Sequence, residues 1–299
     1  MTPLRQAIAA ATARLAAAGV ASPRIDAELL AAHAAGVERG RLMFLDDPGE
    51  RFEQAFDDLV AARSRRIPLQ HLLGTALVAA RSRRIPLQHL LGTAPFGPLT
   101  LEVGPGVFIP RPETEALLEW ACARELPDNP VIVDLCTGSG ALALGLAANW
   151  PDARVLAVEN SPTALDFARR NAAGTRVEVL DADVTAPGLL PELDAGVDLL
   201  VSNPPYIPEA AELEPEVAQH DPAAALFGGA DGMSVIRPIV ALAARWLRDG
   251  ATCAVEHDDT TSGLSVEAFT SDGHFTEVTA RRDLAGRPRF VAATRIGRS

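Results

Sequence analysis

The stretch VIVDLCTGSGALALGLAANW at residues 131–150 decides the fold. The apolar run at 131–135 predicts a buried strand, and the turn at 137–140 carries two glycines. The apolar sequence from Ala141 onward predicts a helix. A strand that turns directly into a helix is typical of strand–helix–strand crossovers, which connect parallel strands.

The same alternation continues along the chain. Further strands are predicted at 154–159 (RVLAVE), 176–183 (RVEVLDAD), 197–203 (VDLLVSN) and 251–257 (ATCAVEH). Ser161 and Pro162 have the residue types of a helix N-cap and first helical position, and 233–248 predicts another helix. The last segments, FTEVTARRD and PRFVAATR, fit an antiparallel edge. The fold class is therefore α/β, with a doubly wound, mostly parallel sheet and an antiparallel C-terminal edge.

The chain before this sheet has a different pattern. Helical periodicity covers 2–46, with a stop at Gly19, a new start at Ser22-Pro23 and a short piece at 41–44; it returns at 53–66. We predict a small helical domain over 1–94 that recognises the substrate. A linker follows over 95–110, where LTLEV and VFIP suggest a hairpin, and then a catalytic domain over 111–299.

One segment occurs twice in tandem. The 18 residues LVAARSRRIPLQHLLGTA at 59–76 are repeated without change at 77–94. Solenoid repeats need three or more diverged units. We interpret the tandem copy as a recent in-frame duplication or an artefact rather than a functional repeat, so that one of the two copies is redundant for the fold.

Composition excludes several classes of protein. Hydrophobic residues make up 48% and charged residues 22% of 299, a globular balance. The net charge of -12 disfavours non-specific nucleic-acid binding. No apolar run reaches membrane-spanning length. The three cysteines are widely spaced, so we expect no disulfide framework, no metal site and a cytoplasmic location. The absence of lysine excludes a Schiff-base or P-loop lysine.

The first candidate site lies where the 131–135 strand meets its helix, a usual ligand position in open α/β sheets. Gly138 and Gly140 allow close approach of the backbone to a ligand. Asp134 can hold an amine or order the loop. Glu159, at the end of the next strand, can accept hydrogen bonds from two ribose hydroxyls. Together they indicate an adenosine-containing ligand whose identity these residues leave open.

The second candidate site is Asn203-Pro204-Pro205-Tyr206, directly after the fourth predicted strand. A planar amino group is a poor nucleophile because its lone pair is delocalised. The Asn203 side-chain oxygen and the Pro204 carbonyl can accept its two N–H bonds and favour a localised lone pair. The prolines stiffen the loop, and Tyr206 offers a face for stacking. The pattern predicts methyl transfer to a planar amine by in-line displacement.

With these motifs, the chain resembles the protein-glutamine methyltransferases of peptide chain release factors, a branch of the class I S-adenosylmethionine-dependent methyltransferases with an NPPY motif. The matching pieces are FIPRPETE (108–115), DLCTGSGALAL (134–144), Glu159, NPPYIP (203–208) and DGMSVIR (231–237). The helical N-terminus ending in PLQHLLG also matches.

The resemblance implies S-adenosyl-L-methionine as cofactor and release factors as protein partners. The implied cofactor-binding residues are Thr137, Gly138, Ser139, Gly140, Ala141, Glu159, Asp183, Val184 and Asn203. Asn203, Pro204, Pro205 and Tyr206 would bind the substrate glutamine, with Asn203, Pro204 and Tyr206 catalytic. Residues 111–115 would cap the pocket. We expect a monomer without a nucleic-acid partner.

Three features depart from the family. Val184 stands where an aromatic residue is common, VEHDDTTSG lacks the usual glycine and glutamine, and the 59–94 duplication lies in the connection between domains. Three other functions remain open from the residues alone. The first is a nucleic-acid methyltransferase acting on adenine or guanine amines, which present the same planar NH₂. The second is a catalytically impaired scaffold. The third is a dinucleotide oxidoreductase, which leaves the NPPY motif unexplained.

Overall fold

The computed structural model describes residues 3–37, 42, 45, 48, 51–67, 69, 72, 84–283 and 285–297. Contacts divide the chain into two units, Met1–Ile85 and Pro86–Ser299. The junction of the two repeat copies lies outside the described residues, and so does the short piece expected at 41–44, apart from Leu42.

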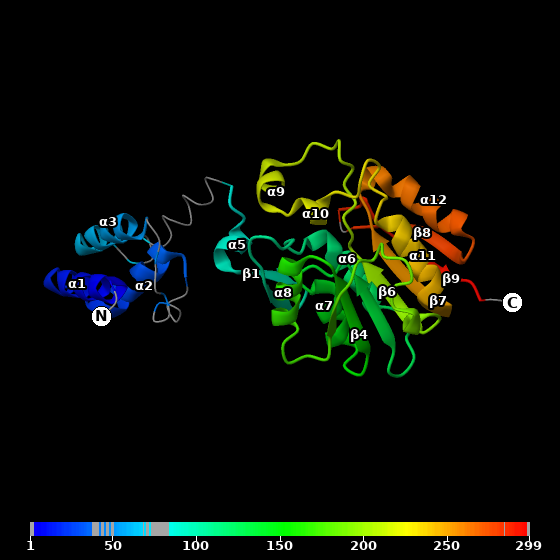
Figure 1. The fold of residues 1–299 in the computed structure, drawn as a ribbon, viewed down its shortest axis with the longest axis horizontal. Helices are drawn as coiled ribbons and strands as arrows, with labels where there is room; N and C mark the ends of the chain where they lie inside the picture. The colour runs from blue at the N-terminus through cyan, green and yellow to red at the C-terminus, as the bar shows by residue number, and fades with distance from the viewer. Residues whose placement is uncertain are drawn as a thin grey trace. The chain divides into compact units, whose positions relative to one another are not determined.

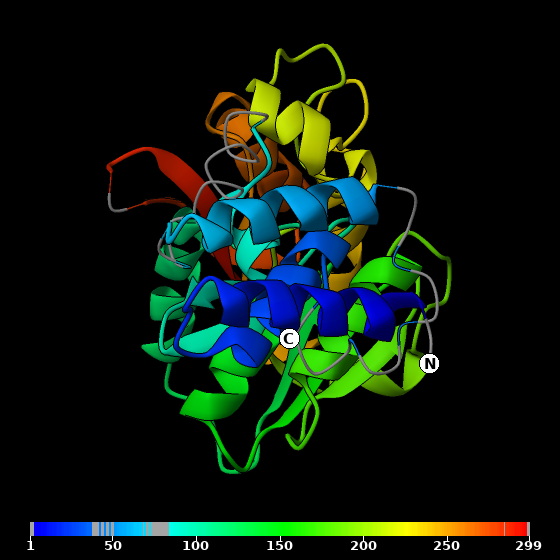
Figure 2. The same cartoon turned by 90° about the vertical axis from the view of Figure 1, so that its left-hand side faces the viewer.

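The first unit is helical, as predicted. Helices α1 (Pro3–Ala17), α2 (Pro23–Ala35) and α3 (Phe52–Ser64) pack against one another around buried apolar side chains such as Leu15 and Leu30 (Figures 1 and 2). An ion pair between Arg63 Nε and Asp26 Oδ2, 2.7 Å long and largely buried, ties α3 to α2. The predicted helix start at Pro23 is confirmed.

The second unit begins with α5 (Leu87–Leu91) and an antiparallel hairpin of β1 (Thr93–Phe96) and β2 (Leu99–Glu102). The hairpin lies earlier than the sequence indicated. LTLE pairs with TAPF across the two-residue turn Gly97-Pro98, and 107–110 forms no strand. Because a two-residue turn can join adjacent antiparallel strands, LTLE pairs with TAPF, the segment directly before the turn.

The central sheet has seven strands in the order β5-β4-β3-β6-β7-β9-β8. Their bounds are β3 (Val131–Leu135), β4 (Arg154–Glu159), β5 (Glu178–Asp181), β6 (Val197–Ser202), β7 (Leu247–Glu256), β8 (Phe275–Arg282) and β9 (Pro288–Arg295). The first five are parallel, whereas β9 runs antiparallel to both β7 and β8. The predicted doubly wound sheet and its antiparallel edge are confirmed.

Several element boundaries differ from prediction: the strand expected over 176–183 is confined to β5 (Glu178–Asp181), and the helix expected over 53–66 is α3 (Phe52–Ser64). The helix expected over 233–248 is α11 (Ile236–Trp246), and β7 begins at Leu247 rather than 251. Leu247 already pairs with Val197, and a register shift follows before Leu199 pairs with Thr252. The shift accommodates the extra residues of β7 between Leu247 and Thr252. The pairing of β7 with β6 is regular from Thr252 onward.

Helices cover both faces of the sheet (Figure 1). On one face α6 (Pro112–Cys122) and α7 (Ala141–Asn149) pack on strand residues such as Ile132. On the other face α11 and α12 (Ser262–Asp272) pack on residues such as Val133 and Leu135. Alternate side chains of the strands therefore supply two separate cores.

The remaining elements are α8 (Pro162–Asn171), α9 (Pro215–His220), α10 (Ala223–Leu226) and the 3₁₀ turns η2 (Pro191–Leu193) and η3 (Asp259–Thr261). The Ser161 side chain accepts a hydrogen bond from the backbone N–H of Ala164, which confirms the predicted N-cap. Among the described helices, none has both the length and the apolar character that crossing a bilayer requires.

Candidate active site

A cavity of about 500 Å³ opens at the carboxyl ends of β3, β4 and β6. The connections from neighbouring strands leave toward opposite faces here, which makes this edge the natural ligand crevice of the sheet. Eleven predicted site residues line it: Thr137, Gly138, Ser139, Ala141, Glu159, Asp183, Val184, Asn203, Pro204, Pro205 and Tyr206. Gly140 is not part of the lining; it is the N-cap of α7.

Asp134 organises the glycine turn at the end of β3. Its carboxylate Oδ2 accepts hydrogen bonds from Thr137 Oγ1 at 2.5 Å and from the Ala143 backbone N–H at 3.0 Å. Its Oδ1 is buried and has no hydrogen-bond partner among the described residues. Burial raises the pKa of Asp134 to about 7. Asp134 thus orders the loop with one oxygen and lines the cavity, while its other oxygen is buried without a partner among the described residues.

Glu159 holds the same loop from β4. Its Oε2 accepts the Gly138 backbone N–H at 2.9 Å, and its Oε1 accepts the N–H groups of Asn160 and Ser161 at 3.0 and 2.9 Å. Each carboxylate oxygen has two lone pairs, so Oε2 keeps one for a ligand hydroxyl. Glu159 is therefore both a structural anchor and an available acceptor.

Asp183 and Val184 follow β5. Asp183 Oδ1 accepts hydrogen bonds from the Thr185 backbone N–H at 2.8 Å and from the Thr185 hydroxyl at 2.7 Å. This local bonding shapes the turn. Val184 is buried and lends the cavity an apolar wall.

Asn203 is fixed by a residue from the FIPRPETE segment. Its amide nitrogen donates a hydrogen bond to Thr114 Oγ1 at 3.1 Å. Thr114 is only 3% exposed and lies in the first turn of α6. With the amide nitrogen so engaged, the Asn203 side chain offers its oxygen as an acceptor. The Pro204 carbonyl accepts no hydrogen bond within the described ranges.

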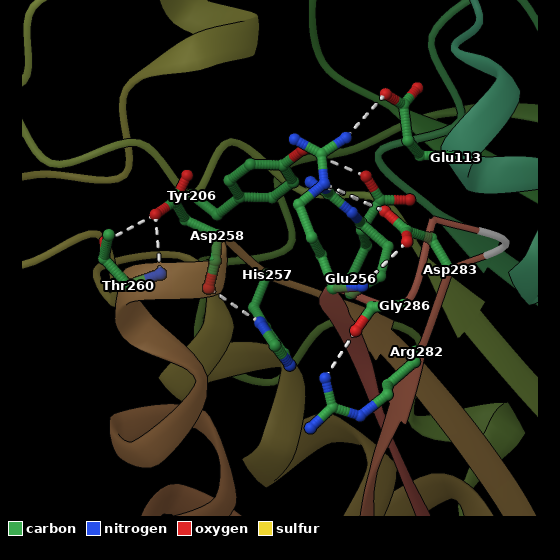
Figure 3. Close-up of polar contacts among 11 residues, drawn as sticks. Glu113, Tyr206, Glu256, His257, Asp258, Thr260, Arg282, Asp283 and Gly286 are labelled. Atoms are coloured by element: carbon green, nitrogen blue, oxygen red, sulfur yellow. Dashed lines mark hydrogen bonds and ion pairs between the residues drawn. The ribbon is translucent and has the colours of Figure 1, made fainter.

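Tyr206 is held through its hydroxyl. The hydroxyl donates to Glu256 Oε1 at 2.9 Å, and Figure 3 shows it pointing at that carboxylate. Glu256, at the end of β7, is 1% exposed. Burial raises the pKa of Glu256 to about 7, although the nearby Thr114, the hydrogen bond from Tyr206 and the charge of Arg289 act in the opposite direction. Burial likewise raises the pKa of Tyr206.

The DGMSVIR segment packs its backbone against the NPPY loop. Gly232 has φ +75°, and a Cβ there would lie 2.3 Å from the Tyr206 carbonyl oxygen. A Cβ at Gly228 would lie 2.6 Å from the Pro205 carbonyl oxygen. Only glycine allows such close approach, so these two positions set where the loop lies.

Of the predicted cap at 111–115, Arg111, Glu113 and Thr114 line the cavity, whereas Pro112 and Glu115 are not part of the lining. Arg111 forms an ion pair with Asp221, which ties the start of α6 to the segment after the NPPY loop. Arg287 Nη2 lies 3.5 Å from Glu113 Oε1 and forms an ion pair with it.

Sequence reasoning did not identify Glu256 or the individual role of Thr114. Glu256 does carry a signal: it ends a parallel strand at the same sheet edge as Glu159 and Asn203.

Comparisons with known proteins show which family the chain belongs to. Residues 6–74 match the family described as PrmC N-terminal domain, and residues 112–222 match the methyltransferase small domain. Proteins called release factor glutamine methyltransferase are similar over nearly the full length. The one from Mycolicibacterium smegmatis is 73% identical over 299 residues, covering 100% of both chains. That from Mycobacterium leprae is 55% identical, covering 99% of this chain and 98% of the relative.

A more distant relative with the same description, from Corynebacterium glutamicum, is 46% identical over 300 residues and is covered completely. These alignments cover nearly the whole of each chain, so the similarity extends over both the helical N-terminus and the methyltransferase sheet. The chain belongs to the release factor glutamine methyltransferase family.

Proposed function

We propose that this chain transfers a methyl group from S-adenosyl-L-methionine to the side-chain amide nitrogen of a glutamine in peptide chain release factors. The observation that carries the proposal is the orientation of Asn203, whose amide nitrogen is bonded to Thr114. The names of the full-length relatives support the substrate. They also disfavour the nucleic-acid alternative, as does the net charge of -12.

The residues at the glycine turn suit S-adenosylmethionine. Asp134 lines the cavity, and its buried Oδ1 has no hydrogen-bond partner among the described residues, which suits an ammonium group. Glu159 Oε2 has a lone pair for a ribose hydroxyl, and Val184 supplies an apolar surface for adenine. The cofactor, when bound, supplies a sulfonium methyl group as electrophile.

The NPPY loop would prepare the nucleophile. The Asn203 oxygen and the Pro204 carbonyl accept the two N–H bonds of the substrate carboxamide, which favours a localised lone pair on nitrogen. Pro205 restricts the loop, and Tyr206 presents its ring to the planar amide. Rate acceleration then comes mainly from holding the amide in line with the methyl group. Once the nitrogen is methylated it is acidic, so its proton can leave without a dedicated base.

We propose different roles for the successive parts of the chain. We assign recognition of the release factor to the helical domain over 1–94, a connecting role to 95–110, and methyl transfer to 111–299. Cys122, Cys136 and Cys253 are all free thiols, which supports a cytoplasmic location. We further propose that the protein acts as a monomer and without a nucleic-acid partner.

The test is methyl transfer from labelled S-adenosylmethionine to a purified release factor, beside the same factor with its target glutamine substituted. Asn203→Ala should lower kcat by about a hundredfold, the scale of losing one preorganised hydrogen-bonding group. Asn149→Ala, an exposed asparagine at the end of α7, is the matched control and should keep full activity. Equal labelling of the substituted release factor would reject the proposed substrate.

A further inference from the structure

The register of the sheet brings the Glu256 carboxyl beside the NPPY loop. Val201 of β6 pairs with Ala254 of β7, and both residues pack in the core that α6 covers. Side chains of a strand alternate between the two faces, so Asn203 and Glu256, each two residues further on, lie on that same face. Neighbouring strands are about 4.8 Å apart. Glu256 is therefore the cross-strand neighbour of Asn203.

Glu256 has little to neutralise its charge. It is 1% exposed and lines the cavity. Its Oε1 accepts the Tyr206 hydroxyl at 2.9 Å, and its Oε2 has no hydrogen-bond partner among the described residues. Arg289 also lines the cavity, but its ion pair, 3.3 Å long, is with Asp283. Across the described ranges, no ion pair joins Glu256 to a cation.

A buried carboxylate without an ion-pair partner destabilises the fold. Holding the Tyr206 hydroxyl does not require this charge, because the side-chain oxygen of a glutamine would accept the same hydrogen bond. A perturbed acid in a cleft is a candidate functional group. The charge of Glu256 therefore calls for a role in the cavity itself.

Glu256 is ionised at moderately alkaline pH. Burial raises its pKa to about 7. The charged and titratable groups that face it are Glu113 from α6, Tyr206 from the NPPY loop and Arg289 from β9. Arg289 favours the ionised form, whereas Glu113 opposes it. His257, the next residue in the chain, is neutral at this pH because burial lowers its pKa.

We propose that Glu256 is a specificity-determining residue: its negative charge beside Asn203 favours the neutral carboxamide of glutamine and rejects the carboxylate of glutamate. The inference rests on the proposed function, since it concerns the same substrate group. The Asn203 oxygen and the Pro204 carbonyl already suit a side chain with N–H groups to donate. Glu256 adds the repulsion between two full charges, which at this range weakens binding of a carboxylate by about tenfold or more.

The experiment uses two substituted release factors as competitive inhibitors, one with glutamate and one with leucine in place of the target glutamine. Leucine is neutral and of similar size. The ratio of their inhibition constants, glutamate over leucine, measures rejection of the charge, because all contacts that the two factors share cancel. At about pH 8 and saturating S-adenosylmethionine, Glu256→Gln should lower this ratio at least about tenfold relative to wild type.

Asp198→Asn is the matched control. Asp198 is also a buried carboxylate, 3% exposed, but it lies near the opposite end of β6 from Asn203. Asp198→Asn should lose stability and keep the wild-type ratio.

A second measurement uses the wild type alone. The ratio should fall as the pH is lowered from about 8 to about 6, because Glu256 takes up a proton. Titration of Asp134 affects both inhibitors alike and cancels from the ratio. Three results would overturn the inference: an unchanged ratio in Glu256→Gln, an equal fall in Asp198→Asn, or a wild-type ratio that does not vary with pH. Failure of the wild type to methylate the natural release factor would instead reject the proposed function.

Discussion

Replacing Gly232 with alanine tests how the NPPY loop is held in place. The new Cβ would lie 2.3 Å from the Tyr206 carbonyl oxygen, whereas real Cβ contacts essentially never fall below 3.0 Å. Moving from 2.3 to 3.0 Å requires a shift of at least about 0.7 Å in one of two packed backbone segments. A displacement approaching 1 Å at reacting groups can cost about a hundredfold in rate. We therefore expect Gly232→Ala to lower kcat by about ten- to a hundredfold.

The matched control is Gly273→Ala. Gly273 ends α12 with φ +80°, close to the +75° of Gly232, but a Cβ there meets nothing within 4 Å. Both variants carry the cost of a left-handed alanine, about 1–2 kcal/mol of unfolding free energy. Only in Gly232→Ala does the new Cβ clash with the Tyr206 carbonyl oxygen. The assay compares kcat with thermal unfolding for the two proteins, and equal kcat in both would refute the reasoning.

Four further predictions follow from the same contacts. Glu159→Ala should weaken S-adenosylmethionine binding by about 1–3 kcal/mol, since it removes an acceptor and loosens the loop; unchanged affinity by calorimetry would exclude Glu159 from the site. Tyr206→Ala should lower kcat more than Tyr206→Phe, because phenylalanine keeps the ring face; equal losses would assign the role to the hydroxyl that Glu256 accepts. The free energy of unfolding should decline as the pH rises from about 4.5 to about 7, because Glu256 keeps a proton in the folded state that it has lost in the unfolded chain. In chemical denaturation, Glu256→Gln should show a shallower decline of this free energy with pH. Deleting one 18-residue copy should leave a protein that folds and binds cofactor, since loop length changes closure entropy only slowly; a deletion variant that unfolds would make the duplicated segment integral to the fold.

Much of the sheet could be predicted from local pattern. β3 and β4 have the predicted bounds because each is a short apolar run between clear turn signals, and Ser161-Pro162 marks the start of α8. The β1–β2 pairing was not predicted because TAPF contains a proline and lacks the β-branched residues, other than Thr93, that usually mark a strand. Pairing also depends on the partner, which a local pattern does not specify.

The sequence predicts which residues form the site but not the hydrogen bonds that orient them. The motifs place eleven residues in one cavity because the carboxyl ends of parallel strands meet at one edge. The bonds that orient those residues join distant parts of the chain. Asn203 and Thr114 are 89 residues apart, and Tyr206 and Glu256 are 50 apart. No spacing rule links such positions, so the direction of the hydrogen bonds emerges only in the folded structure.

Tyr206 gives the protein a built-in spectroscopic reporter. It is the one tyrosine among 299 residues, and its hydroxyl lies 2.9 Å from the Glu256 oxygen. A sample isotopically labelled in tyrosine alone should therefore give one set of ring resonances in an NMR spectrum. Because the chain has one tyrosine, these resonances belong to Tyr206 without further assignment. Their chemical shifts would report Glu256 ionisation and ligand entry in the intact wild-type enzyme, without a substitution or an attached probe.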